Sequence, residues 1–191
     1  LTFEQLNAST TPVITHDSEG TLHIYRCRVA QNGVSPTQGY AILQGQGSLV
    51  IDESQITHTT SGNATRYAFC VNPSTASNTQ INRSVLSGPS VCLLNPGFYT
   101  DCVVSILDTQ MDSTHASGKG IVSDASSLTV SYSTLSTASG DAILVHPGAA
   151  VFNTDVEVYL RWSFIEGDVS YDVTGIAGST VLDLGASAYS T

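Results

Sequence analysis

One phrase of eight residues occurs twice in the C-terminal half of the chain, as Leu128-Thr-Val-Ser-Tyr-Ser-Thr-Leu135 and as Val158-Tyr-Leu-Arg-Trp-Ser-Phe-Ile165. Both copies read apolar-x-apolar-x-x-small-x-apolar. The alternation predicts a strand with one buried face, and the small residue after a two-residue gap indicates a bend. Four further copies lie upstream, in Leu22–Val29, Leu49–Ile56, Thr79–Leu86 and Val104–Met111.

Six copies at offsets of roughly 24 to 30 residues form an internal repeat of the kind found in solenoids. Aligned, they give three columns of similar residues. The middle apolar column is Ile24, Ile51, Ile81, Ile106, Val130 and Leu160. The small column is Cys27, Ser54, Ser84, Thr109, Ser133 and Ser163, and the last apolar column is Val29, Ile56, Leu86, Met111, Leu135 and Ile165. A parallel β-helix stacks like residues about 4.8 Å apart, because every coil fills the same cross-section.

A second strand follows in each repeat, and several of these strands end at Asn-Pro or His-Pro, where proline stops the ladder. Partial coils are expected near Phe3–Ile14 and Val181–Leu184. An antiparallel β-sandwich also has short strands every 8–12 residues, but it has no reason to stack matching columns. The repeat therefore predicts an all-β parallel helix of about six to seven coils. Residues 1–191 would form a single domain, part of a larger protein or assembly.

The composition limits the function. A net charge of −10, with one lysine and five arginines, argues against nucleic acid or an anionic membrane as partner. No apolar run approaches 18 residues, so membrane insertion is not expected. The four cysteines lack Cys-x-x-Cys spacing, so no metal and no cofactor is expected. Free thiols are the favoured state, with Cys92 and Cys102 as the only plausible disulfide pair.

The strand register predicts one outward-facing column. Its members are Arg26, Glu53, Arg83, Asp108, Tyr132 and Trp162. Charges alternate over four coils and two aromatic residues follow, an order that suits neighbouring strands because opposite charges attract and aromatic rings prefer aromatic neighbours. Packing is one explanation for the two aromatics. The other is binding, since stacked rings suit sugars, and Tyr132 and Trp162 are the candidate binding residues.

Two segments resemble the pectin methylesterases. Ser163-Phe-Ile-Glu-Gly-Asp-Val169 is similar to the segment leading to that family's nucleophilic aspartate, and Asp141-Ala-Ile-Leu-Val-His146 to the stretch that supplies its general acid/base. The resemblance covers about 35 residues. It implies the pectin-lyase-like fold, a single-stranded right-handed parallel β-helix. It also implies a mechanism in which one carboxylate attacks the ester, another moves protons and glutamines hold the oxyanion.

The chain departs from that family at the residues that matter for catalysis. Ser170 stands at the nucleophile position, and Gly140 stands where the oxyanion glutamine would precede Asp141. A shifted pair of Asp141 and Asp172 is the alternative. Aligning the hydrophobic columns puts Val173 over Ile143, however, and this register places the two carboxylates on opposite faces.

The sequence therefore favours a non-enzymatic structural or adhesive module of an exposed structure, such as a virus or phage fibre or spike, or a bacterial surface protein. We expect an extracellular, virion or cell-surface location. The stacked core would hold three loops, Gln31–Gln38, Thr57–Arg66 and Asp112–Lys119, toward a glycan or a neighbouring subunit, and a homo-oligomer is expected. The alternative is a carbohydrate-active enzyme of the pectin methylesterase type with the shifted pair.

Overall fold

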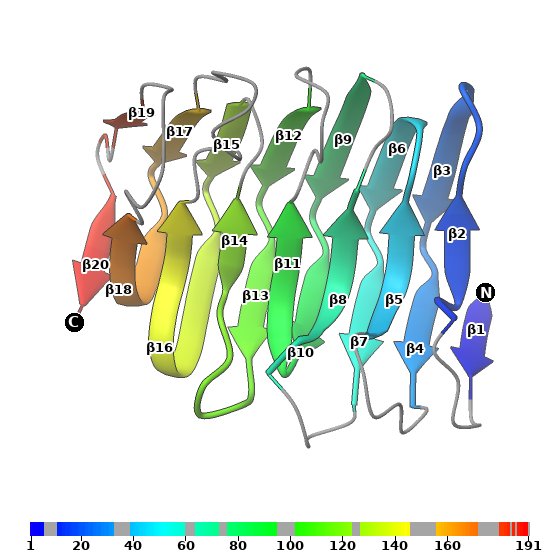
Figure 1. The fold of residues 1–191 in the computed structure, drawn as a ribbon, viewed down its shortest axis with the longest axis horizontal. Coiled ribbons are helices and arrows are strands. Elements are labelled where there is room, and N and C mark those ends of the chain that lie inside the picture. Colours follow the sequence, from blue (N-terminus) through cyan, green and yellow to red (C-terminus); the bar gives the residue numbers. More distant parts are fainter. Residues whose placement is uncertain are drawn as a thin grey trace.

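The computed structural model is an all-β solenoid in which strands of successive coils pair in parallel (Figure 1). It describes residues 1–5, 11–32, 39–59, 64–72, 76–94, 102–123, 127–145, 156–171, 180–183, 185 and 187–190. The arrangement is consistent with a right-handed parallel β-helix. The β-helix predicted from the repeat is thus confirmed.

The strands form two sheets that run the length of the helix. The seven-stranded sheet contains β3 (Thr21–Tyr25), β6 (Gly47–Asp52), β9 (Ser77–Asn82), β12 (Cys102–Leu107), β15 (Ser127–Ser131), β17 (Val156–Arg161) and β19 (Thr180–Asp183). The thirteen-stranded sheet covers the other two sides. One side has β1 (Thr2–Gln5), β4 (Arg28–Gln31), β7 (Gln55–His58), β10 (Val85–Gly88), β13 (Gln110–Ser113) and β20 (Ala188–Ser190). The other has β2 (Ile14–His16), β5 (Gly39–Gln44), β8 (Arg66–Val71), β11 (Ser90–Leu94) and β14 (Ile121–Ser123).

Two long strands, β16 (Thr134–Val145) and β18 (Phe164–Tyr171), bend to serve both of these sides. The helix has about 5 turns, slightly fewer than the six to seven expected. The difference arises at the ends, where β1 and β2 precede the first complete coil and β19 and β20 follow the last (Figure 1). These are the partial coils expected near both ends of the repeat.

The predicted columns are the ladders of the structure. Ile51 pairs with Ile24 on one side and Ile81 on the other, and the middle column continues in this way to Leu160. The last apolar column is in register from Val29 to Ile165. Both columns are buried. Stacked aliphatic side chains therefore fill the interior from coil to coil, and their burial supplies the main stabilisation of the fold.

The small column has a chemical role in addition to its size. Where the chain turns the corner after the seven-stranded sheet, the amide of each small residue points toward the next coil. There it meets a side-chain hydroxyl rather than a carbonyl, as the Thr109 amide does at Ser133 Oγ (3.1 Å). That hydroxyl donates to the carbonyl of Ser131 (2.8 Å). Acceptors of the same kind, 3.0–3.4 Å from the amide, are Ser54, Ser84, Thr109, Ser163 and Ser187.

We call these residues the hydroxyl column. All of them except the half-buried Ser187 are buried, so a side chain without an oxygen would leave one amide per coil without an acceptor. The repeated phrase predicts a small residue at this position, but it does not predict the need for a hydroxyl group.

The cysteines are free, as expected, and the possible bond between Cys92 and Cys102 is not formed. Cys92 lies opposite Phe69, and Cys70 lies opposite Leu93. Burial is the main cause that raises the thiol pKa to about 12 for Cys70 and to about 11 for Cys102, and it also raises the pKa of Cys92. These buried thiols are protonated at neutral pH and are poor nucleophiles.

Candidate binding site

One residue of each coil turns the corner after the seven-stranded sheet with a positive φ, between 45° and 52°. We call these residues the corner column: Arg26, Glu53, Arg83, Asp108, Tyr132 and Trp162. They are the six residues that the sequence predicted to face outward, and all except the half-buried Glu53 are exposed. The left-handed conformation explains the two-residue gap in the repeated phrase. It costs an ordinary residue about 1–2 kcal/mol.

The N-terminal half of the corner column is a chain of ion pairs. Arg26 Nε lies 2.6 Å from Glu53 Oε2, and Arg83 contacts Asp52 at 2.6 Å and Glu53 at 3.6 Å. The hydrogen bond from Arg26 lowers the pKa of the Glu53 carboxyl. The predicted attraction between neighbouring coils is therefore confirmed for the first three corners.

The charge alternation fails at the fourth corner. Arg83 turns toward Asp52 and Glu53, and no ion pair joins it to Asp108 within the described residues. The Asp108 carboxylate is exposed and has no hydrogen-bonded partner in the part of the chain that the structure describes. Asp108 thus separates the paired charges from the aromatic half of the column.

A groove lies beside Asp108. Its volume is about 360 Å³, and its walls are formed by Arg83 and Tyr132 from the coils on either side. Gln110 and Thr134 also line it. We call this hollow the corner groove. A second hollow of about 390 Å³, lined by Leu107 and the same three corner residues, lies on the side of the seven-stranded sheet. The short Asp108 side chain between two long ones leaves this space.

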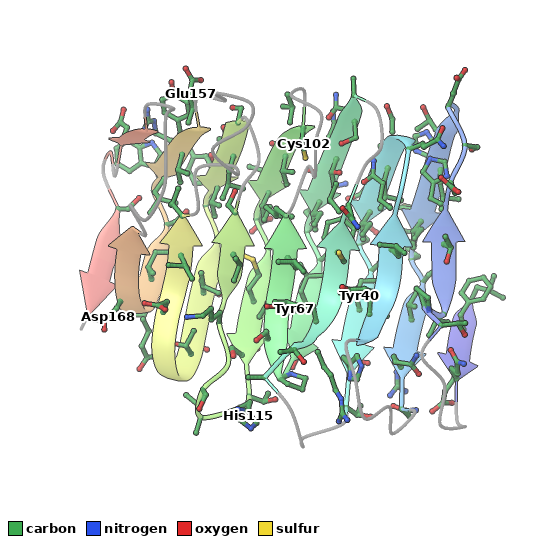
Figure 2. All side chains as sticks on the ribbon, viewed as in Figure 1. Tyr40, Tyr67, Cys102, His115, Glu157 and Asp168 are labelled. Carbon is green, nitrogen blue, oxygen red and sulfur yellow. The ribbon has the colours of Figure 1, made fainter. Side chains whose placement is uncertain are left out.

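Tyr132 and Trp162 occupy neighbouring corners and are 61% and 62% exposed. Their rings do not stack on one another, contrary to the packing expectation. Within the described residues the aromatic ring pair is instead Tyr40 with Tyr67, 6.3 Å between centroids, on β5 and β8 (Figure 2). Phe164, the first residue of β18, comes shortly after Trp162 in the sequence and is 48% exposed. The aromatic half of the corner column is therefore an exposed surface without a packing partner among its own rings.

The register between β16 and β18, on which the catalytic alternative depends, differs from the one expected. Val169, not Val173, pairs with Ile143, and Ser170 pairs with Leu144. The error has a structural cause. Beyond the aligned pair Leu135 and Ile165, β16 uses residues 136–142 to round the second corner, whereas β18 uses only residues 166–168.

Asp141 consequently pairs in register with Asp168, a residue that the sequence pattern did not single out. Figure 2 labels Asp168 on β18. A glycine with positive φ precedes each aspartate, Gly140 at 136° and Gly167 at 122°. The repeated Gly-Asp dipeptide was the signal that could have fixed this register. Asp172 lies outside the described residues.

The carboxylates of Asp141 and Asp168 have unequal surroundings. Asp141 is half-buried and ion-paired with Lys119 Nζ, whereas Asp168 is exposed. The ammonium group of Lys119 neutralises Asp141, whereas no ion pair to Asp168 occurs among the described residues. No glutamine lies beside Asp141, because Gly140 precedes it. The arrangement can supply two carboxylates, but it has no side-chain amide at the position of the family's oxyanion donor.

Of the three predicted loops, Asp112–Lys119 is fully described. The Thr114 amide donates to the Gly88 carbonyl (2.8 Å), and the Lys119 amide donates to Ser90 Oγ (2.9 Å). This loop is therefore anchored on the preceding coil. Residues 33–38 of the loop Gln31–Gln38 and residues 60–63 of the loop Thr57–Arg66 lie outside the described residues.

Comparison with known proteins gives no relative for the chain: no protein family, no curated protein and no solved structure matches it. The resemblance to pectin methylesterases thus rests on the two short segments alone. The described residues contain no helix long and apolar enough to cross a membrane. Nor do they contain a group of three or more His, Cys, Asp or Glu side chains that could hold a metal ion.

Proposed function

We propose that this chain is a non-enzymatic β-helix module that binds a glycan on the corner column, with Tyr132 and Trp162 as the sugar-stacking residues. One observation carries the proposal. Two bulky residues hold a left-handed conformation while more than half of each side chain is exposed. All six corners share this conformation, so Tyr132 and Trp162 differ from the others in presenting exposed aromatic rings at neighbouring corners. Adjacent exposed apolar surface of this kind favours a binding role. Flat aromatic faces beside polar groups are suited to the apolar faces and hydroxyls of a sugar.

The corner groove supports the same function. Arg83, Asp108, Gln110 and Thr134 offer hydrogen-bond donors and acceptors within reach of the Tyr132 ring. The backbone under the groove is held from coil to coil by the hydroxyl column. A preorganised site of this kind loses little conformational freedom on binding.

The biological setting that we propose is an exposed surface structure: a virus or phage fibre or spike, or a bacterial surface protein. The module would present its corner column and its loops at fixed spacing to a glycan or to a neighbouring subunit in a homo-oligomer or larger assembly. The anchored Asp112–Lys119 loop and the Ser- and Thr-rich composition, 26 and 22 residues, agree with rigid presentation in water.

The test is a glycan array probed with the intact chain, followed by titration of the best ligands. Tyr132→Gly and Trp162→Gly should weaken binding at least about tenfold while leaving the melting temperature equal or higher, because glycine adopts a positive φ without cost. Arg26→Gly is the matched control, since it changes the same corner position at the other end of the column. Binding that survives both aromatic substitutions would refute the assignment.

A second candidate, the carbohydrate-active enzyme, rests on the cross-strand pair Asp141 and Asp168. Retaining or inverting chemistry on a sugar, and ester hydrolysis, both use two carboxylates. If the chain is a non-enzymatic module, it should release no more methanol from methylated pectin than a heat-killed control does. Hydrolysis that disappears in both Asp141→Asn and Asp168→Asn would favour the enzyme instead.

A further inference from the structure

The charges around the corner groove are unequal, and this inequality bears on which glycan it takes. Among the described residues, Arg83 is the one cationic side chain that lines the groove, and its guanidinium already contacts Asp52 at 2.6 Å and Glu53 at 3.6 Å. Glu53 is itself shared with Arg26. Two arginines are therefore balanced by two carboxylates before Asp108 is counted.

Asp108 adds a carboxylate that no cation in the described part of the chain neutralises. It lines the groove together with Arg83 and Tyr132, the corner residues of the coils on either side. The whole chain carries a net charge of −10, so the long-range field has the same sign. An anionic ligand would meet repulsion both on approach and in the groove.

We infer that Asp108 is a specificity-determining residue that makes the corner groove select uncharged sugars over acidic ones. This inference rests on the proposed glycan-binding function and names its ligand class. An ionised carboxylate accepts strong hydrogen bonds from two neighbouring hydroxyls of a neutral sugar. The carboxylate of a uronic or sialic acid at the same place would bring two negative charges together without a free cation.

Asp108→Asn is a suitable test variant. The substitution preserves the side-chain shape and removes the charge, and asparagine tolerates the left-handed conformation better than most residues. A thermal melt matching that of the parent chain would verify that the corner is intact. Asp17→Asn is the matched control, because it removes one charge by the same substitution at an exposed residue that does not line the groove.

The probes are pairs of glycans that differ in charge: a methyl-esterified oligogalacturonide with its de-esterified form, and N-acetyllactosamine with its sialylated form. For the parent chain we expect the neutral member to bind at least about tenfold more tightly. Asp108→Asn should reduce this ratio to less than about threefold, and Asp17→Asn should leave it unchanged. Added salt should also reduce the ratio for the parent chain, because the discrimination is electrostatic.

Two results would overturn the inference and leave the proposed function standing: an acidic member that binds the parent chain as tightly as the neutral one, or a ratio that Asp108→Asn does not change. The absence of binding to every neutral and acidic glycan on the array would overturn the proposed function itself, and the inference with it.

Discussion

The amide of Thr109 donates to the hydroxyl of Ser133 in the next coil, 3.1 Å away, in the interior of the helix. This bond replaces a backbone-to-backbone bond at the point where the chain turns the corner. It makes the small residue of each repeat a hydrogen-bonding residue, and it leads to the first prediction.

Ser133→Ala should destabilise the protein by about 1–3 kcal/mol, because the buried Thr109 amide loses its acceptor. Ser133→Leu should cost more, since overpacking adds to the lost bond. Ser133→Thr is the control, because threonine keeps the hydroxyl and already occupies this column at position 109. Urea denaturation measures all three. An alanine variant as stable as the threonine variant would show that the column is selected by size alone.

The ion pairs of the corner column predict a coupling between coils. Glu53→Arg would place three arginines at successive corners, and it should lower the melting temperature slightly at low salt. Adding Arg83→Glu should recover part of the loss, because opposite charges again face each other. Raising the salt concentration should weaken the effect. A double-mutant cycle without coupling at low salt would mean that these corners do not interact.

His58 predicts a pH dependence of stability. It is buried near Arg66, and burial followed by the arginine charge lowers its pKa from 6.5 to about 4. The unfolded chain therefore binds this proton first, so stability is fully present above about pH 6.5 and is lost as the pH falls toward about 4. The loss is up to about 3 kcal/mol.

His58→Gln should reduce the pH dependence of the melting temperature between pH 6.5 and pH 4. His23→Gln is the control, because His23 lies on the exposed face of β3. A profile that keeps its slope without His58 would assign the dependence to other groups.

The cysteines predict unequal thiol reactivity. Cys27 is partly exposed, whereas Cys70, Cys92 and Cys102 are buried with raised pKa values. One thiol should react with a chromogenic disulfide reagent in the native protein, and the other three should react only after unfolding. Cys27→Ser should abolish the native reaction. Prompt reaction of a second thiol would show that the coils open locally.

The sequence was sufficient to predict the helix because the repeated phrase carries both of its determinants, the buried aliphatic columns and the corner. Ile51 and Ile81 had to stack whatever the details of the loops. The same sequence was insufficient at the second corner, where β16 and β18 use different numbers of residues, so counting from Leu135 misplaced Ile143 against Val173. Loop length is set by local turn geometry and has no counterpart in the hydrophobic pattern.

The binding surface was predicted only in part. The outward position of Tyr132 and Trp162 followed from the alternation, but their left-handed backbone and the absence of stacking did not. The corner groove depends on the contacts of Arg83. Its long side chain lies near the carboxylates of Asp52, Glu53 and Asp108, and it pairs with the first two. A column of charges read from the sequence cannot distinguish between these partners.

The left-handed corners have a consequence for the surface that they carry. All corner side chains except the half-buried Glu53 are exposed. The amides of the first five corner residues donate to carbonyls of the next coil at 2.9–3.2 Å. These backbone bonds do not depend on the side chain, so its chemistry can change without disturbing the interior. Successive corners are separated by the spacing between neighbouring strands, about 4.8 Å. The corner column is therefore a molecular ruler, a linear array of exchangeable positions at a fixed interval. Pairs of cysteines or spin labels placed along it would report the pitch of the coils directly in solution.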